Sequence, residues 1–471
     1  MSNKSQPSSQ VAFALFAAIV GIIAVGSALL AISIHVLLII ALTLTCYVSL
    51  RLGYTLDELI ESMARTIGQS MSALLVFILI GCIIGAWIHS GTVPALIFYG
   101  LEFLPPKYFL PAGLVICSIA SVVTGTSWGT IGTVGLALLG VGIGLGIPPG
   151  LVAGMIISGA FFGDKMSPIS DTTNLAALTA KTTIYSHIGS MLFTTIPAYI
   201  ITLVLFTLVG FGYSGAESAD AAEVALIQEV LATEFDLNPM VLTPMAALLT
   251  MMVVRVHTLP AMLTGVVVGT IVSLVFQDAS LASALTAINE GYTNKTGVEV
   301  VDTLIVRGGI QSMMYTFSLT FIALSLGGVL EQVGYLRVVV DKTIEKIKSA
   351  ASLIAFVLFS TAFSNAATGD TYISIILNGS LYGDTFDRAG LDRSTLSRLL
   401  EEGGTMTGAL IPWTSTGAFI TGTLGVSTLS YLPYCFLNII NPMLSIALAY
   451  VGLITARDVS RIVAAKKADV L

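Results

Sequence analysis

The sequence predicts an all-α, polytopic membrane protein built from two inverted-topology repeats. Three observations lead to this fold: an apolar composition, a series of runs long enough to cross a bilayer, and an internal duplication. Of the 471 residues, 55% are hydrophobic and only 10% are charged, whereas about 25% of residues in soluble domains are charged. The composition therefore argues against a soluble fold.

Several apolar runs approach or exceed the roughly 17 to 25 residues that a bilayer core requires. They are Val11–Leu30, Val36–Leu50, Met71–Ile88, Ile188–Gly210, Met240–Val254, Leu259–Phe276, Tyr315–Leu330 and Tyr431–Ile454. More spans follow the first run at once, so we interpret it as a membrane helix and not as a cleaved signal peptide. The four cysteines lie in apolar runs without CxxC spacing, so neither a disulfide framework nor a zinc site is predicted.

Sequence motifs recur between the two halves of the chain. The run Thr124–Thr130 is echoed by Thr368–Ser374, an offset of 244 residues from Thr124 to Thr368, and Pro168–Thr173 maps onto Pro412–Gly417 at the same offset. Several ordered matches indicate a duplication, because a single match would occur by chance. We therefore divide the chain into a first repeat (1–212), an acidic linker (213–238), a second repeat (239–456) and a tail (457–471).

The distribution of Lys and Arg predicts that the repeats are inverted. The loops Leu336–Lys348 and Phe386–Arg398 are basic, which is typical of cytoplasmic loops, whereas their counterparts Leu101–Tyr108 and Val141–Gly150 hold a single lysine. Equivalent loops should therefore face opposite sides. The basic tail places both termini in the cytoplasm, and the linker, which has no Lys or Arg, lies outside. The net charge of −7 is concentrated in that linker, and no basic patch suggests nucleic-acid binding.

Each repeat also contains apolar segments too short to cross the membrane singly. Two of them flank the polar stretch Thr124–Thr130, and two flank Asn365–Tyr372, which predicts one re-entrant hairpin per half. Further segments are interrupted at Gly163–Asn174 and around Pro412–Gly417, and these predict helices broken at mid-membrane. We expect about five crossings, one of them broken, and one hairpin in each half.

The stretch Gly163–Asn174 places many polar side chains between apolar segments. They are Asp164, Lys165, Ser167, Ser170, Asp171, Thr172, Thr173 and Asn174. A carboxylate at bilayer depth costs a few kcal/mol and is usually retained for a pathway or a site. Its oxygens, with carbonyls freed by the helix break, suit small hard cations. A desolvated carboxylate can also bind a proton in competition with the cation.

The second repeat carries its charge elsewhere. Asp370 stands at the hairpin tip where the first half has Thr126, and Ser415 replaces Asp171. This asymmetry is expected if one site is assembled from both halves. The remaining candidates for ion or substrate binding are Thr124, Thr126 and Ser127 in the first hairpin, and Asn365, Thr368, Asp370, Thr371, Thr414 and Thr416 in the second half.

Structural roles compete with binding at several of these positions. Ser and Thr side chains can bond back to their own helix, and Asp164 and Lys165 could cap or pair at a helix end. We expect Lys165 to neutralise Asp164 or Asp171. Glu401 and Glu402, near cytoplasmic arginines, are interpreted as a solvated entrance.

At these motifs the chain resembles the NhaC-type sodium/proton antiporter family of the ion transporter superfamily, and it looks bacterial. The residues that carry the resemblance are Thr124–Thr130, Gly163–Asn174 and Thr368–Asp370. The resemblance implies exchange of Na⁺ for H⁺, no cofactor, a homodimer in the cell (inner) membrane, and an elevator-like motion. Similar members exchange malate for sodium and lactate, so an organic acid is an alternative substrate.

Our main hypothesis is a Na⁺/H⁺ antiporter in which Asp171 and Asp370 bind Na⁺ or H⁺ in turn. One alternative is a sodium-coupled dicarboxylate or hydroxy-acid antiporter, which would need exposed donors for a carboxylate. Another is an intramembrane enzyme that uses the two carboxylates as acid and base. The predicted inverted duplication and the lack of an HExxH motif argue against the enzyme.

Overall fold

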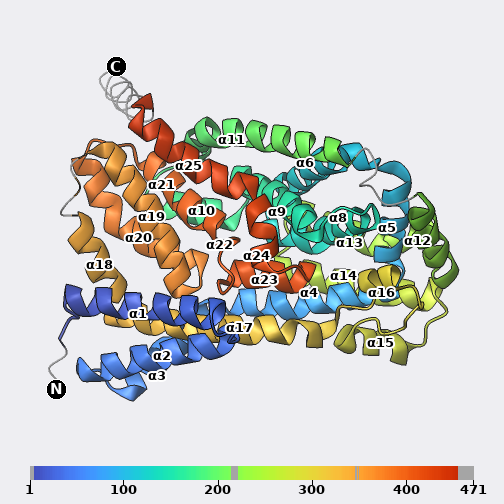
Figure 1. Ribbon diagram of the computed structural model, residues 1–471, viewed down its shortest axis with the longest axis horizontal. Helices are drawn as coiled ribbons and strands as arrows, with labels where there is room; N and C mark the ends of the chain where they lie inside the picture. Colours follow the sequence, from blue (N-terminus) through green and yellow to red (C-terminus); the bar gives the residue numbers. More distant parts are fainter. Residues whose placement is uncertain (1–4, 214–220, 345–346, 348, 454–471) are drawn as a thin grey trace.

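The computed structural model describes residues 5–213, 221–344, 347 and 349–453, and throughout this part of the chain the regular structure is helical (Figure 1). The elements of the first half are α1 (Ser9–Ala28), α2 (Ile34–Arg51), α3 (Leu56–Gln69), α4 (Met71–His89), α5 (Thr92–Phe103), α6 (Pro106–Thr124), α7 (Ser127–Thr130), the π-helical turn η1 (Ile131–Gly135), α8 (Leu136–Gly144), α9 (Pro149–Met166), α10 (Asp171–Thr179) and α11 (Ile184–Gly212).

The second half follows a helix from the linker, α12 (Ala221–Glu234). Its elements are the 3₁₀ turn η2 (Pro239–Leu242), α13 (Thr243–Val253), α14 (Thr258–Phe276), α15 (Leu281–Glu290), α16 (Glu299–Ile305), α17 (Gly309–Val333), α18 (Tyr335–Ile344), α19 (Ala350–Thr368), α20 (Thr371–Arg388), α21 (Arg393–Gly403), α22 (Thr405–Gly408), α23 (Ser415–Leu424), α24 (Thr428–Tyr431), the 3₁₀ turn η3 (Leu432–Tyr434) and α25 (Phe436–Tyr450).

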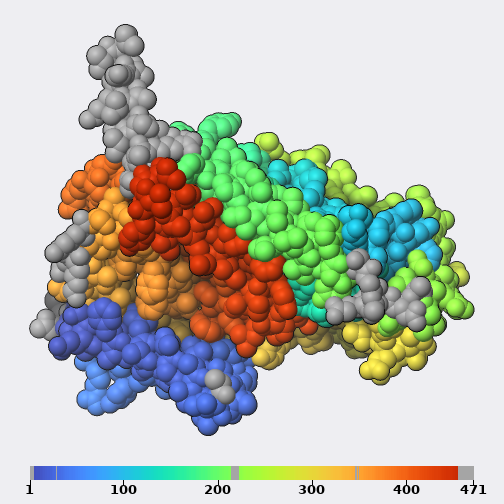
Figure 2. All heavy atoms as spheres, turned by 45° about the horizontal axis from the view of Figure 1, so that its top comes forward, coloured from blue at the N-terminus to red at the C-terminus, as the bar shows by residue number. Residues whose placement is uncertain are grey.

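The predicted all-α, polytopic membrane fold is confirmed. Within the described residues, 9 helices are long and apolar enough to cross a bilayer, or up to 11 if each of two bent pairs counts as one span. The helices α1, α2, α4 and α17 run along one edge of the elongated molecule (Figure 1). On another face α11 lies beside α25, as the green and red surfaces of Figure 2 show.

Helical hairpins form at both predicted positions. The arms Pro106–Thr124, Ser127–Gly144 and Ala350–Thr368 are long and apolar enough to cross a bilayer, so the expectation that they are too short is wrong. Their re-entry into the membrane stays a prediction.

The tips of the two hairpins are built alike. Each tip begins with a glycine in the left-handed region, Gly125 at φ 70° and Gly369 at φ 71°. The next residue caps the following helix through its side chain: Thr126 accepts from the Gly129 N–H, and Asp370 accepts from two N–H groups. Glycine is needed because a side chain at this φ is strained. The caps satisfy helix-end N–H groups that lipid could not.

Both predicted helix breaks are present; the first is narrower than the sequence suggests, and the second begins and ends earlier than Pro412–Gly417. In the first half α9 continues to Met166 and α10 resumes at Asp171, so that only 167–170 are non-helical. In the second half α22 ends at Gly408 and α23 begins at Ser415. Each break contains a proline, which cannot donate a backbone hydrogen bond. The breaks therefore leave backbone groups that neighbouring side chains must satisfy.

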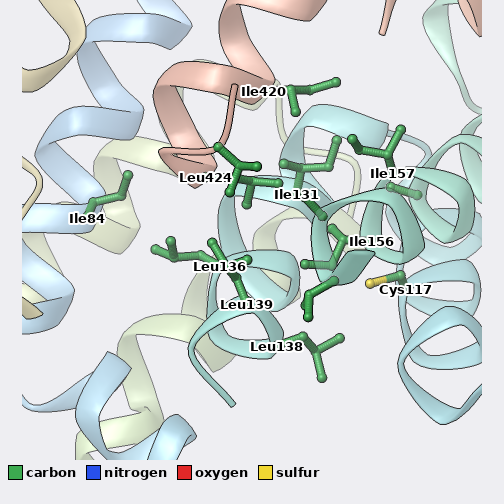
Figure 3. Packing of buried hydrophobic residues seen from close by; sticks show 14 of the residues in the cluster. Ile84, Cys117, Ile131, Leu136, Leu138, Leu139, Ile156, Ile157, Ile420 and Leu424 are labelled. Carbon is green, nitrogen blue, oxygen red and sulfur yellow. The ribbon is translucent and has the colours of Figure 1, made fainter. Parts of the chain in front are cut away.

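The first hairpin packs deeply into the core. Its returning arm carries Ile131, Leu136 and Leu139, which lie among Ile156 of α9, Leu424 of α23 and Ile84 of α4 (Figure 3). The outgoing arm, α6, approaches α9 closely because α9 has glycines at the contact; a Cβ on Gly159 would stand 2.6 Å from the Leu114 carbonyl oxygen. Small residues permit such close packing of helices in membranes. The hairpin tip is consequently held beside the break of α9.

The linker is partly described. Its helix α12 buries Ile227 and Leu231 completely and contacts α5, while Glu223 and Glu229 stay exposed, as an amphipathic surface helix should. Residues 214–220 and the tail 457–471 lie outside the described residues. The boundaries of the two repeats and their inverted relationship stay predictions.

The hairpin tips give a test of the fold. Changing Gly125 to Ala should lower stability by about 1–2 kcal/mol, because the alanine would be strained at a positive φ, and its Cβ would lie 2.5 Å from the Ile169 side chain. Thermal unfolding of the detergent-solubilised protein measures this. The control is Gly21→Ala in α1, where no atom lies within 4 Å of the new Cβ; equal midpoints for the two variants would contradict the assigned strain.

Candidate functional site

The hairpin tips and helix breaks surround a cavity of about 540 Å³. Four carboxylates from both halves line it: Asp164, Asp171, Glu331 and Asp370. Hydroxyl groups and the aromatic rings of Trp128 and Tyr372 form much of the remaining wall. No Lys or Arg of the described residues lines the cavity. A wall with four acidic side chains and no strong base creates a negative potential that attracts cations.

Asp164 connects the first hairpin with the break of α9. It stands in the last turn of that helix and is only 4% exposed. Each carboxylate oxygen accepts one hydroxyl hydrogen bond at 2.5 Å, from Ser127 at the hairpin tip and from Ser170 in the break. Such short bonds to an ionised acceptor are strong. Asp164 therefore organises the polar part of the first half.

Asp171 lines the cavity as an exposed side chain, in contrast to the buried Asp164 and Asp370. It is the first residue of α10, where an acidic side chain is favoured by the helix dipole. The Thr172 N–H donates to Oδ1 at 2.8 Å, and the Tyr372 hydroxyl donates to Oδ2 at 2.5 Å. Because Tyr372 belongs to the second hairpin, this bond joins the two halves across the cavity.

Asp370 combines a structural role with a place in the cavity wall. As the cap of α20, its Oδ1 accepts from the N–H groups of Tyr372 at 2.9 Å and Ile373 at 3.1 Å. Its Oδ2 accepts from the Ser70 hydroxyl at 3.1 Å. Ser70 sits at the junction between α3 and α4. The second hairpin is thus fastened to the first-half helices at the cavity.

Lys165 does not neutralise Asp164 or Asp171, so that expectation is wrong. The side chain is fully buried and donates to Glu402 Oε1 at 3.2 Å and to Asn441 Oδ1. The expected solvated entrance at Glu401 and Glu402 is also wrong, because both are 0% exposed. A buried ammonium group is tolerated only when a carboxylate with satisfied hydrogen bonds lies next to it. For Lys165 this carboxylate is Glu402 on α21, in the second half of the chain.

Many of the predicted residues serve the backbone. Hydroxyl or amide hydrogen bonds to main-chain carbonyls are made by Thr124 to Ala120, Ser167 to Val122, Thr173 to Asp164, Asn174 to Ser170, Thr368 to Ser364, and Thr414 to Gly408. Asn365 donates to the Gly404 carbonyl at 2.7 Å. In this state these side chains therefore stabilise the main chain, which was the structural alternative to ion binding.

The remaining candidates meet at the cavity. Its wall includes Thr126, Ser127, Asp164, Asp171, Thr172, Asp370, Thr371 and Thr416. Ser170 lies just behind, bonded to Asp164. The structure thus brings both proposed sodium carboxylates, Asp171 and Asp370, to one space, although they come from different halves of the chain.

Sequence reasoning missed several residues of the site. Glu331 lines the cavity and directly follows the apolar run Tyr315–Leu330. Its position as an acidic residue at the end of a predicted span could have identified it as a site residue. Ser70 lies in the stretch Arg65–Met71, which matches Arg307–Met313 at an offset of 242 residues. The contacts of Glu402 and Asn441 with Lys165 could not be predicted from the neighbouring sequence, because they depend on where Lys165 lies in the folded protein.

Comparison with known proteins places the chain in a family. A family model described as the Na+/H+ antiporter family matches residues 159–453, which include both helix breaks and the second hairpin. The chain belongs to the Na⁺/H⁺ antiporter family. The match agrees with the resemblance seen in the sequence motifs.

Relatives in this family are named as transporters of different solutes. A Bacillus subtilis protein named malate-2H(+)/Na(+)-lactate antiporter is 40% identical over 419 residues, 89% of each chain. The Na(+)/H(+) antiporter NhaC of Alkalihalophilus pseudofirmus is 36% identical, over 90% of this chain and 92% of its own. The arginine/ornithine antiporter ArcD of Halobacterium salinarum is 35% identical, over 95% and 93% respectively.

The Lys165–Glu402 pair yields a second prediction. Lys165→Met should destabilise the antiporter by about 3–5 kcal/mol, because it removes the nearer of the two cations of the buried Glu402 carboxylate and leaves only Arg398 at 3.9 Å. Adding Glu402→Gln should restore part of that loss, since the second change removes the carboxylate that lost Lys165, although Arg398 then loses its ion pair with Glu402. Thermal unfolding of both variants in detergent measures the coupling. Additive losses in the double variant would show that the two side chains do not stabilise each other.

Proposed function

We propose that the chain exchanges Na⁺ for H⁺ across the membrane by alternating access. The observation that carries the proposal is the cavity wall, which presents four carboxylates and no Lys or Arg of the described residues. Carboxylate and hydroxyl oxygens are the ligands that hard cations prefer. Family membership supports the same function.

In this proposal Asp171 and Asp370 bind Na⁺ or H⁺ in turn. Each has a carboxylate at the cavity and belongs to a different half. Sodium binding requires the ionised form, while a proton neutralises the same oxygens, so the two cargoes exclude each other. Antiport follows if the occupied site is exposed first to one side and then to the other.

The principal alternative is sodium-linked exchange of a hydroxy acid, as the name of the Bacillus subtilis relative suggests. An organic anion needs free donors. Lys165, however, is occupied by Glu402 and Asn441, and the hairpin N–H groups of Tyr372 and Ile373 are occupied by Asp370. The arrangement favours a cation.

Several finer points belong to the same proposal. The site would move as in an elevator, with hairpins and broken helices shifting against a scaffold. The protein would reside as a homodimer in the bacterial inner membrane with both termini in the cytoplasm. The basic loops Leu336–Lys348 and Phe386–Arg398 support this orientation.

Neutralising the two sodium carboxylates tests the proposal. Asp171→Asn and Asp370→Asn should each reduce Na⁺-driven proton flux in proteoliposomes at least tenfold, because an amide cannot bind a proton or supply a negative charge. Asn is a good helix cap, so Asp370→Asn removes the charge while it preserves the hairpin tip. The control is Asp57→Asn on the exposed side of α3. Wild-type flux in both site variants would refute the assignment.

A counterflow assay separates the two transport functions. Vesicles loaded with unlabelled malate or lactate should not accumulate the labelled acid, since four carboxylates face the cavity and His257 is the one basic side chain among the described residues that line it. The same preparation should acidify or alkalinise its lumen when a Na⁺ gradient is imposed. Accumulation of labelled acid without any Na⁺-driven proton flux would establish the alternative instead.

A further inference from the structure

One buried carboxylate, Glu401, has no part in the mechanism described so far. It stands on α21 beside Glu402 in the sequence, and both are 0% exposed. A carboxylate at this depth is costly unless it is paired with a cation or neutralised. Whether Glu401 is ionised or protonated therefore depends on which nearby cations pair with it and which pair with Glu402.

Glu402 takes the partners that Glu401 would need. Lys165 donates to it at 3.2 Å, Arg398 approaches it at 3.9 Å, and the hydroxyls of Thr194 and Ser445 also donate to it. Glu402 is thus a fully satisfied, ionised partner of the two buried cations. Neither of the ion pairs of this cluster involves Glu401.

Glu401 receives much less. Its Oε1 accepts one hydrogen bond, from the Thr172 hydroxyl at 3.0 Å. The Thr405 hydroxyl faces the same carboxyl group, but its geometry falls short of a full hydrogen bond, and within the described part of the chain neither Glu401 Oε2 nor Thr405 Oγ1 has another partner. An ionised carboxylate so poorly solvated is unfavourable, whereas the protonated form carries no charge and can donate from Oε2.

Glu401 is separated from the cavity by only one layer of side chains. Thr172, its hydrogen-bond donor, lines the cavity, and so does Thr405. Thr172 follows the first-half break, whereas Glu401 precedes the second-half break. A hydroxyl thus bridges the cavity and a buried carboxyl group contributed by the other half.

We propose that Glu401 is a proton-binding site of the exchanger, separate from Asp171 and Asp370 and loaded from the cavity through Thr172. A hydronium ion in the cavity gives a proton to Thr172 Oγ1 as Thr172 passes its own hydrogen to Glu401 Oε1. The products are a water molecule in the cavity, a neutral carboxyl group and an unchanged hydroxyl. Release follows the same steps in reverse, so no other reactant is needed.

The charges around Glu401 agree with this assignment. The titratable groups on the surrounding elements are Asp164 and Lys165 on α9, Asp171 on α10, Tyr185, His187 and Tyr199 on α11, Tyr372, Tyr382, Asp384, Asp387 and Arg388 on α20, Arg393, Arg398 and Glu402 on α21, and Tyr450 on α25. Both buried cations, Lys165 and Arg398, form ion pairs with Glu402. An ionised Glu401 would add a further negative charge that faces the Asp164 carboxylate and has no ion pair of its own within the described residues.

This inference rests on the proposed antiport and concerns how many protons move. Wild type and Glu401→Gln are reconstituted, and the opposing pH gradient that just cancels a fixed Na⁺ gradient is measured. Glu401→Gln should retain exchange but carry one proton fewer per cycle, so that the balancing pH gradient shifts. The matched control, Glu229→Gln on the exposed face of α12, should leave it unchanged. The same balance point and pH profile in Glu401→Gln and wild type would overturn the proposal.

Infrared difference spectroscopy keeps the question decidable if Glu401→Gln does not transport. The wild type should show the band of a protonated carboxylic acid that changes when the pH is raised, and this band should be missing in Glu401→Gln and restored in Glu401→Asp. A band of equal size in wild type and Glu401→Gln would refute the assignment. If the wild type does not exchange Na⁺ for H⁺, the proposed function is refuted. The infrared spectra would still show whether Glu401 binds a proton.

Discussion

A bilayer core offers a broken helix no solvent with which to form hydrogen bonds, and this constraint governs the organisation of the antiporter. Interrupted backbone is tolerated at membrane depth only where protein or a wet cavity satisfies it. Here two hairpin tips and two helix breaks are gathered together, and each interruption is satisfied by its own side chains or by those of a neighbouring one. Thr126 and Asp370 cap the hairpin helices, and Ser167 bonds to the backbone of the first hairpin. The cavity is the space left between these four interruptions.

The same constraint explains why charge is shared across the halves. Lys165 precedes the first break and finds its carboxylate partner, Glu402, before the second. In the cavity, Tyr372 of the second hairpin bonds to Asp171 after the first break. These contacts link the broken helix of one half to elements of the other. Movement of one broken helix alone would separate buried charges, so the two are expected to move together.

Much of this architecture could be predicted from local sequence. Apolar runs located the spans, and the duplication identified the two hairpins and the two breaks, because glycine, proline and polar clusters have a defined meaning inside a membrane. Asp164, Asp171 and Asp370 were found for the same reason, since each interrupts an apolar stretch. The width of the first break was overestimated, because α9 retains helical hydrogen bonding through Asp164 and Lys165 as far as Met166.

What could not be predicted depends on contacts between distant parts of the chain. Lys165 lies next to Asp164 in sequence, yet its partner is 237 positions away. Glu401 and Glu402 follow arginines that were predicted to be cytoplasmic, which suggested exposure, but the packing of α10, α11, α19 and α20 against α21 buries them. Thr124, Thr368 and Thr414 were predicted as ligands because they lie in the polar motifs of the hairpins and of the second break, and their hydroxyls satisfy the main chain instead.

The central claim is that sodium and protons exclude each other at one cavity of carboxylates. Its most direct test is the release of protons when Na⁺ is added to the purified, detergent-solubilised antiporter in weak buffer, followed with a pH indicator. The account predicts acidification that saturates with Na⁺, that is absent when choline replaces Na⁺, and that disappears at a pH high enough to deprotonate the site beforehand. Saturable binding of radioactive Na⁺ without any proton release would contradict it.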